Sequence, residues 1–320
     1  MKGSARSAWT ALSWLRMRCH DAGHAASRGC GVEGERPVLL VTKRSFYEVY
    51  GLERKDADFL AHLPKDRELA DWLMADYEEN RDAIAAVESF LDQHGTRYVR
   101  SSGVQRGVDG RYSLIVAVGG DGTLLAASHD AVSTPVVGIN SRPGRSIGYF
   151  CAADRADFPE VLRDILGGRM LPKTLSRMDV FVNGERRCPP VLNDVLYCAV
   201  SPAATSVYRL ALGDVEEIQR SSGVWIATPA GSTAGIAAAG GRKMSLTGSS
   251  MQFLVREPYV GVGTRYRLDR GVFSEGLCLT SLTPHASIYV DGSRIAFELS
   301  YGDRVEPRAS EKPLRIYLHR

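Results

Sequence analysis

The sequence lacks paired cysteines and long apolar runs. Its six cysteines form no C-x-x-C pair and no histidine cluster lies near them, so neither a zinc site nor a disulfide framework is predicted. Unpaired cysteines are typical of an intracellular protein with reduced thiols, and we expect a cytoplasmic location. No stretch reaches the roughly 18 consecutive apolar residues of a transmembrane helix, so no membrane association is expected.

The chain also has no excess of basic charge outside its N-terminal segment. Residues 1–36 hold six basic and three acidic side chains, whereas the remaining residues hold 34 of each. A body without basic excess does not predict a nucleic-acid partner. Residues 1–36 are predicted to be a tail, a stretch added by an early start codon, or an organellar transit segment, which would change the expected location.

The length of 320 residues predicts two domains, at roughly 150 residues each. Residues 37–171 alternate strand and helix patterns, which indicates an α/β domain with a parallel sheet. Residues 172–320 are dominated by strand patterns with one alanine-rich helix at Ser232–Ala239, which indicates a β-rich domain. The boundary is expected near Pro172, without a low-complexity linker.

The elements of the first domain follow from their hydrophobic patterns. Apolar positions recur at helical spacing over 65–94, and Gly95 is placed to end that helix. The continuous apolar run Leu114–Val118 predicts a strand buried on both faces. Pro135–Ile139 predicts a second such strand, and a helix is expected over 155–166.

The buried strand leads directly into the glycine turn G-G-D-G-T at residues 119–123. In open α/β sheets, ligands bind at this end of the strands. Successive glycines let the backbone amides of Gly119, Gly120 and Thr123 approach a phosphate. Asp121 at the centre could accept the proton of an attacking hydroxyl. The turn is neither a Walker loop nor a G-x-G-x-x-G fingerprint, because the spacing differs and a carboxylate lies at its centre. The alternative to a ligand site is a tight turn with an aspartate cap.

Three further groups of residues are candidates for ligand binding. Thr228–Gly235 opens the alanine-rich helix, which Ser232 and Thr233 could cap. Asn193 and Asp194 interrupt an apolar stretch and could hydrogen-bond a ribose or a base. Asp291 and the glycine after it also match a hairpin turn. Taken singly, Asn193-Asp194 and Asp291 fit structural roles better, as a turn before a strand and as a hairpin turn. The Thr228–Gly235 group is also consistent with a well-capped helix that has a small packing face.

Together, the order and spacing of these features resemble the NAD kinase family, over roughly residues 110–300. The resemblance includes Gly138-Ile139-Asn140, then Ile147-Gly148-Tyr149-Phe150, and Arg177 at the opening of the second domain. Several stretches are similar to the plant-type NADH kinases in particular, namely Arg145–Gly148, Cys151–Ala153, Cys198–Ser206, Arg220–Gly223 and Phe253–Pro258.

The resemblance implies transfer of a phosphoryl group to the 2′-hydroxyl of the adenosine ribose of NAD or NADH. ATP is the expected donor, accompanied by Mg²⁺, with polyphosphate as the alternative. The family's assembly is usually a homodimer or homotetramer. Asp121 would be the proton acceptor. The implied dinucleotide site comprises Gly122, Asn193, Asp194, Arg220, Thr233, Ala234, Gly235, Ala238 and Asp291.

Two positions depart from most of the family. Ser222 stands where most members carry aspartate, and Gly235 where they carry tyrosine. The plant-type NADH kinases are similar to this chain in lacking both. We therefore expect both NAD and NADH to be accepted, with NADH somewhat favoured.

Two other functions are compatible with parts of the sequence. Lipid kinases of the diacylglycerol and sphingoid type share the G-G-D-G-T turn, but Asn193-Asp194 and Thr228–Gly235 fit a dinucleotide better. A non-catalytic dinucleotide sensor would explain Ser222 and Gly235. Retention of Asp121 argues against a sensor, because a protein that only binds has less need of a base.

Overall fold

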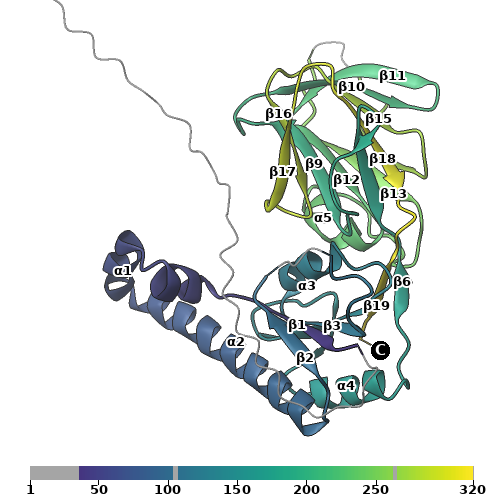
Figure 1. The fold of residues 1–320 in the computed structure, drawn as a ribbon. Coiled ribbons are helices and arrows are strands. Elements are labelled where there is room, and N and C mark those ends of the chain that lie inside the picture. The colour runs from purple at the N-terminus through teal and green to yellow at the C-terminus, as the bar shows by residue number, and fades with distance from the viewer. Residues whose placement is uncertain (1–35, 104–106, 262–264, 320) are drawn as a thin grey trace, which may run out of the picture.

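The protein consists of an α/β region with a two-sheet β region stacked on it (Figure 1). The structure is a computed structural model that describes residues 36–103, 107–261 and 265–319. The predicted tail or transit segment therefore lies outside the described residues, apart from Arg36. Among these residues, no helix is long and apolar enough to cross a membrane.

The first sheet has seven strands, and its core is parallel, as the sequence predicts. The spatial order is β2–β1–β3–β4–β19–β6, with β5 also paired to β4, and only the β19–β6 pair is antiparallel. The strands are β1 (Val38–Thr42), β2 (Tyr98–Ser101), β3 (Leu114–Gly119), β4 (Val136–Asn140), β5 (Cys151–Asp154), β6 (Lys173–Leu175) and β19 (Leu314–Tyr317).

Helices cover both faces of this sheet, which explains its continuous apolar strands. In β1, Val38 and Leu40 pack with α2 (Arg67–Gln93) and α4 (Phe158–Leu166). The alternate residues Leu39 and Val41 pack toward α3 (Asp121–Ser128). Three shorter helices precede α2, namely η1 (Glu48–Glu53), α1 (Ala57–His62) and η2 (Leu63–Lys65). With the start of α2 they form an arm that projects from the body (Figure 1).

The predicted long helix is confirmed as α2. The Asp66 side chain accepts a hydrogen bond from the Leu69 amide, 3.0 Å away, and so caps the helix start. Gly95 follows the helix with φ +63°, a left-handed conformation that glycine adopts without strain. The other predicted helix is also present as α4, although it begins at Phe158.

The second region is a sandwich of two six-stranded sheets, which confirms the β-rich prediction. One sheet has the order β11–β10–β15–β18–β7–β8 and the other β14–β13–β12–β9–β16–β17. The strands are β7 (Met178–Val182), β8 (Glu185–Arg186), β9 (Asp194–Ala199), β10 (Ser206–Leu212), β11 (Val215–Ser221), β12 (Gly223–Ala227), β13 (Met251–Arg256), β14 (Arg270–Phe273), β15 (Cys278–Ser281), β16 (Ala286–Val290), β17 (Ile295–Leu299) and β18 (Arg304–Ala309).

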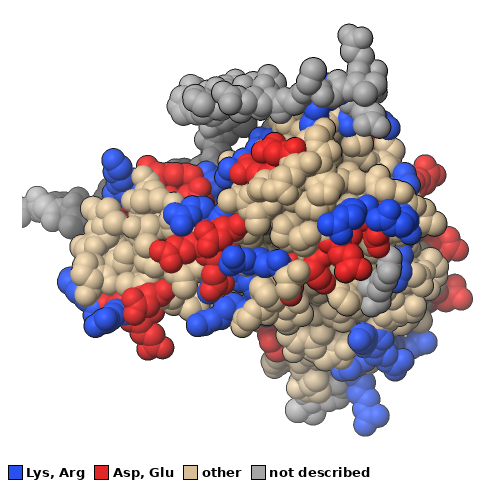
Figure 2. Space-filling model, turned by 90° about the horizontal axis from the view of Figure 1, so that it is seen from below, with Lys and Arg blue, Asp and Glu red and all other residues tan. Residues whose placement is uncertain are grey.

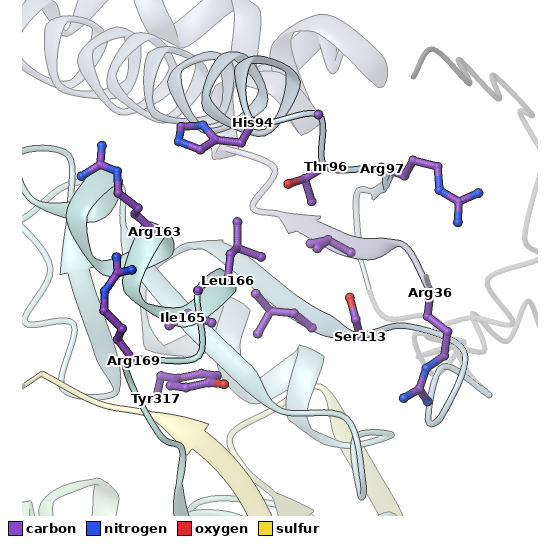
Figure 3. A pocket seen from close by; sticks show the side chains of 14 residues that line it. Arg36, His94, Thr96, Arg97, Ser113, Arg163, Ile165, Leu166, Arg169 and Tyr317 are labelled. Atoms are coloured by element: carbon purple, nitrogen blue, oxygen red, sulfur yellow. The ribbon is translucent and has the colours of Figure 1, made fainter. Parts of the chain in front are cut away.

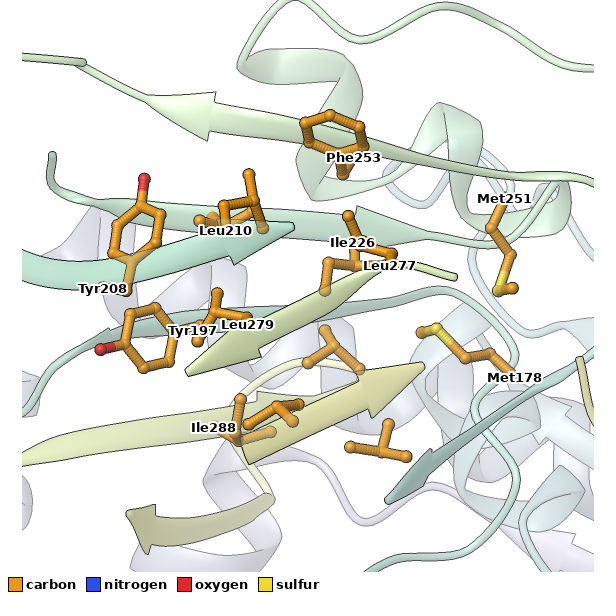
Figure 4. Packing of buried hydrophobic residues seen from close by; sticks show 14 of the residues in the cluster. Met178, Tyr197, Tyr208, Leu210, Ile226, Met251, Phe253, Leu277, Leu279 and Ile288 are labelled. Carbon is orange, nitrogen blue, oxygen red and sulfur yellow. The ribbon is translucent and has the colours of Figure 1, made fainter. Parts of the chain in front are cut away.

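The inner faces of the two sheets form the largest apolar core (Figure 4). Tyr197 from β9 and Tyr208 from β10 meet edge to face, with ring centroids 5.4 Å apart. Their hydroxyls bond to Ser281 at 3.0 Å and Ser221 at 2.8 Å, so no buried hydroxyl lacks a partner there. β9 begins at Asp194, so the sandwich positions this candidate site residue.

The sequence-based division of the chain differs from the sheet pairing at two strands. Both β6 and β19 lie beyond the expected boundary at Pro172, yet they pair within the first sheet. Arg177 holds this crossing in place. Its buried guanidinium donates to the carbonyl oxygens of Ser128 (2.8 Å), Ala131 (2.8 Å) and Lys312 (2.6 Å). Burial lowers the pKa of Arg177 to about 10.

The predicted helix at 232–239 is shorter and interrupted. A 3-10 turn, η3 (Ala230–Thr233), is followed by a break at Ala234 and the four-residue helix α5 (Gly235–Ala238). The expected capping by Ser232 is wrong, since its hydroxyl donates to the Pro229 carbonyl at 2.7 Å and accepts from the Met244 amide at 3.0 Å. No side chain caps either short helix.

Candidate active site

The glycine turn joins the carboxyl end of β3 to the first turn of α3, as predicted. A Cβ on Gly119 would lie 2.3 Å from Thr123 Oγ1, and one on Gly120 would lie 2.7 Å from Ser146 Oγ. A side chain at either position would require the Thr123 or the Ser146 side chain to move. Gly122 instead faces open space, so its backbone is accessible to a ligand.

Asp121 is hydrogen-bonded on both carboxylate oxygens. Oδ2 accepts from the Tyr149 amide at 2.9 Å, and Oδ1 accepts from the Phe150 amide at 2.8 Å. Each oxygen retains a second acceptor position for a ligand hydroxyl. The two bonds fix the orientation of the carboxylate and tie the 147–150 loop to the glycine turn. Asn140, at the end of β4, supports the same loop by donating to the Ser146 carbonyl at 2.9 Å.

A cavity of about 590 Å³ opens over the glycine turn. Its lining includes Gly120, Asp121, Gly122 and Thr123 together with Asn140. Five basic side chains also line it, namely Lys43, Arg44, Arg142, Arg145 and Arg294. Guanidinium and ammonium groups beside open backbone amides are suited to a chain of phosphates. Arg294 comes from the turn between β16 and β17, so both regions of the protein contribute to this cavity.

A buried carboxylate orders two of these basic side chains. Asp76 on α2 accepts from Lys43 and from Arg142, both at 2.7 Å. Burial raises the pKa of Asp76, but these two bonds outweigh it and hold the pKa below its usual value. Arg142 also bonds to Glu79 at 2.9 Å. The pair is therefore held near the cavity rather than left free on the surface.

Sequence reasoning missed these basic residues. A signal was present, because Lys43 follows β1 and Arg142 follows β4, the two neighbours of β3 in the sheet. Side chains after adjacent parallel strands meet at one edge. Arg145 and Arg294 carried no comparable signal, since the loop and the hairpin that place them could not be oriented from sequence.

The second and third predicted groups do meet in the structure. The Thr228 amide donates to the Asn193 carbonyl at 2.9 Å, and the Gly235 amide donates to Asp194 Oδ2 at 3.1 Å. A Cβ on Gly231 would overlap the Asn193 carbonyl, so only glycine allows this approach. Within the described part of the chain, Asn193 Oδ1 is buried and has no hydrogen-bond partner. A ligand donor, such as an amino or hydroxyl group, would satisfy it.

Asp194 is buried beside another carboxylate. Burial, and then the proximity of Asp291, raise its pKa to about 7, against the lowering effect of the Gly235 and Ile236 amides. A buried group with a strongly shifted pKa, next to an unsatisfied acceptor, is a common feature of functional sites.

The indole of Trp225 lies directly beside Gly235. A Cβ on Gly235 would lie 2.9 Å from Trp225 Cη2 and 3.3 Å from Asp194 Oδ2. Trp225 on β12 is half-buried and lies between its cross-strand neighbours Leu196 and Leu254. The ring and the glycine are thus complementary, and a side chain at 235 would need the indole to move.

Asp291 lies within the junction rather than in an open cleft. Its side chain is fully buried, and it accepts from the amides of Leu192 at 3.1 Å and Asn193 at 2.7 Å. His129, directly after α3, lies with Nε2 2.9 Å from Asp291 Oδ2. The carboxylate therefore positions the Asn193–Asp194 segment against α3. Direct contact of Asp291 with a substrate, which the family resemblance implies, stays a prediction.

A second cavity of about 760 Å³ lies at the opposite, amino end of the first sheet (Figure 3). Arg163 and Arg169 stand on one side of it and Arg36 on the other, over an apolar floor (Figure 3). Its described lining contains no carboxylate that could act as a base. On the face seen from below, basic and acidic side chains are interspersed (Figure 2). The cavity over the glycine turn is the better candidate for catalysis.

Comparison with known proteins agrees with this assignment. Residues 62–170 match the family described as ATP-NAD kinase N-terminal domain. A probable NADH kinase of Oryza sativa subsp. japonica is 34% identical over 229 residues, which cover 64% of this chain and 70% of that protein. The NADH kinase of Arabidopsis thaliana is also 34% identical, over 64% of this chain and 72% of its own length. The chain belongs to the NAD kinase family.

Solved NAD kinase structures share the fold. An NAD kinase from Archaeoglobus fulgidus, solved in complex with ATP, superposes with a TM-score of 0.64 at 17% identity, covering 88% of this chain and 93% of that one. A yeast NADH kinase complexed with NADH gives 0.61 at 18% identity, covering 89% and 84%. The expected two-part NAD kinase architecture is thus confirmed.

The remaining residues of the predicted dinucleotide site differ in how close they lie to Gly235. Thr233 and Ala234 are half-buried beside Gly235, whereas Ala238 is exposed at the end of α5. Arg220 lies on β11, the edge strand of the other sheet, with its guanidinium 5.2 Å from the centre of the Tyr259 ring. No described hydrogen bond joins Arg220 to the Asp194 cluster, so its assignment to the dinucleotide site stays a prediction.

Proposed function

We propose that this protein is a kinase that phosphorylates NAD or NADH with ATP, giving NADP or NADPH. The observation that carries the proposal is Asp121, a carboxylate held by two backbone amides in a cavity lined by basic side chains. Membership of the NAD kinase family supplies the acceptor, because relatives are named as NAD and NADH kinases. A lipid acceptor is correspondingly disfavoured.

Each part of the reaction has candidate residues. Asp121 accepts the proton of the ribose 2′-hydroxyl while the oxygen of that hydroxyl attacks the terminal phosphorus of ATP. The new O–P bond forms while the bond to the leaving ADP oxygen breaks. Lys43, Arg145 and Arg294 offset the charge on the phosphate oxygens, and the amide of Gly122 is open to the same oxygens.

The buried polar groups of the second cluster suit the dinucleotide. Asn193 Oδ1 offers an unused acceptor, and Asp194 is held beside it by Gly235. Acceptors of this kind fit the amino group of adenine or a ribose hydroxyl. The half-buried Trp225 borders the same place and offers a ring for stacking.

Mg²⁺ is expected to arrive with the donor. Among the described residues, no group of three potential metal ligands is present. Of the two carboxylates in the cavity lining, Asp76 is already neutralised by Lys43 and Arg142, which leaves Asp121. One carboxylate with donor phosphates is a usual environment for Mg²⁺, so the residues fit a metal held mainly by the nucleotide. Bound there, it would offset phosphate charge.

The redox form of the substrate and the assembly are further parts of the proposal. We propose that both NAD and NADH are accepted, with NADH favoured, supported by Ser222 and Gly235. We also propose a homodimer or homotetramer in the cytoplasm.

A kinase assay that crosses NAD and NADH with ATP and polyphosphate tests the proposal. We expect NADP and NADPH to form with ATP, at a higher initial rate from NADH at equal concentration. Absence of product with every pair would refute kinase activity. A strong preference for NAD would leave the kinase assignment intact and refute the substrate preference.

A further inference from the structure

The lining of the cavity over the glycine turn is of two chemical kinds. Basic side chains form one part of it. The second part, named the aromatic end, consists of Phe46, Val49 and Tyr50, at and just before η1, and Trp72 of α2. The two parts meet where the Arg142 guanidinium lies 5.6 Å from the centre of the Trp72 ring. Phe46 is 50% exposed and Trp72 is 41% exposed, so both present ring surface to solvent. Exposed aromatic rings that line a cavity are a usual feature of ligand sites.

The aromatic end is rigidly built. Phe46 stacks on Tyr50 with centroids 4.3 Å apart and planes 24° apart, and Phe59 of α1 meets Phe46 edge to face at 5.5 Å. Behind it, Ser45 and Glu48 exchange hydrogen bonds, with Ser45 Oγ accepting from the Glu48 amide at 3.0 Å and Glu48 Oε2 from the Ser45 amide at 3.3 Å. This reciprocal capping fixes the start of the segment. The rings are therefore already positioned before any ligand arrives.

One short segment connects the two ends. Lys43 follows β1, and Phe46 lies only three residues later. A ligand with an anionic tail and a planar ring would match both ends at once. The volume of about 590 Å³ is within the range of sites for molecules of nucleotide size.

We infer that the aromatic end, through the exposed rings of Phe46 and Trp72, binds the base of a nucleoside triphosphate donor, while the phosphates extend to Lys43 and the glycine turn. This rests on the proposed kinase function and deepens it by assigning residues that select a nucleotide over polyphosphate. Polyphosphate has no ring, and it would leave the aromatic end unfilled. Stacking accepts any base, so GTP and CTP are expected to substitute for ATP with modest losses.

Steady-state kinetics of Phe46→Ala with NADH as acceptor test the inference. Loss of the stacked ring is expected to raise the KM for ATP about tenfold, the change that about 1.4 kcal/mol of stacking implies. The KM for NADH and the KM for tripolyphosphate, the ringless donor, should stay unchanged. Phe46→Tyr is expected to restore the KM for ATP.

Leu52→Ala is the matched control. Leu52 lies in the same helix η1 and is 45% exposed, but it does not line the cavity. It should leave every constant unchanged. A rise in the KM for ATP as large in Leu52→Ala as in Phe46→Ala, or an equal rise for ATP and tripolyphosphate in Phe46→Ala, would overturn the inference.

Measuring ATP binding directly tests the inference independently of turnover. ATP binding to the intact protein is measured by quenching of tryptophan fluorescence, in wild type and in Phe46→Ala. We expect about tenfold weaker binding in the variant. Equal affinities would overturn the inference even if the kinase is active. Use of polyphosphate but not ATP as donor would also overturn the inference, while leaving the kinase assignment intact. Tight ATP binding that depends on the Phe46 ring, without turnover, would uphold the inference and refute the proposed reaction.

Discussion

His129 and Asp291 meet across the junction of the two regions, with Nε2 2.9 Å from Oδ2. The same carboxylate accepts from the backbone of Leu192 and Asn193, so one buried group joins α3 to the predicted dinucleotide segment. The relative position of the glycine turn and the Asn193–Asp194 cluster therefore depends on Asp291.

Asp291→Asn is expected to destabilise the protein by about 2 to 4 kcal/mol. The amide nitrogen of asparagine would face a backbone N–H or the His129 ring, leaving buried donors unsatisfied. Denaturant unfolding measures the change. Asp214→Asn, at an exposed turn, is the control and should change stability by less than about 0.5 kcal/mol. Equal stabilities of the two variants would contradict the structural role of Asp291.

Asp121→Asn is expected to lower kcat by a factor of about 10² to 10⁴, because asparagine cannot accept the ribose proton. Dinucleotide binding should remain measurable, since the groups that hold the base lie around Asn193. Calorimetric titration with NADH alongside the rate assay separates the two effects. Turnover at the wild-type rate would show that another group is the base.

Gly235 and Trp225 are expected to show energetic coupling. Gly235→Ala places a methyl group 2.9 Å from the indole, which should cost about 1 to 3 kcal/mol of stability. Trp225→Val removes the obstacle, so the double variant should be less destabilised than the sum of the two single variants. Unfolding experiments on all four proteins measure this. Additive effects would mean that the indole already moves freely away from residue 235.

Asp194 should make stability depend on pH. Its pKa is about 7 in the folded chain against an ordinary 3.8, so the folded state binds the proton more tightly. The stability contributed by this proton is full below pH 4, declines as the pH rises from about 4 to about 7, and is absent above that range. Asp194→Asn should remove this dependence.

The difference in unfolding free energy between Asp194→Asn and wild type should therefore increase with pH. An increase of roughly 2 to 4 kcal/mol between pH 4 and pH 8 is expected, at about 1.4 kcal/mol per pKa unit. Thermal or denaturant unfolding at several pH values measures it. A difference that stays constant over this range would be inconsistent with a raised pKa of Asp194 in the folded protein.

The sequence predicted local structure better than long-range pairing. The runs Leu114–Val118 and Pro135–Ile139 were identifiable as strands because their continuous apolar content reflects burial on both faces. The return of β19 to the first sheet could not be predicted, because no local pattern specifies a partner more than a hundred residues away. Strands such as β11, with its polar sequence V-E-E-I-Q-R-S, carry no burial signal.

The candidate site could be predicted where its residues are contiguous in the sequence. Asp121 and its glycines were identified because strand, turn and helix are contiguous. Asp291 was assigned to the substrate through the family resemblance alone, and its D-G pair, which predicts a hairpin turn, gives no indication that the carboxylate is internal. The fit between Trp225 and Gly235 depends on two elements packing together, which only the folded chain displays.

The pairing of β19 with β4 and β6 has a consequence for folding order. During synthesis, β4 emerges long before β19 (Leu314–Tyr317). The first sheet therefore cannot be completed until nearly the whole described chain has been made. The sandwich is completed almost as late, because β18, which joins β15 to β7, ends just before β19 begins. We therefore expect both regions to acquire full protection from proteolysis, and the glycine turn its final setting, only when the last strands dock.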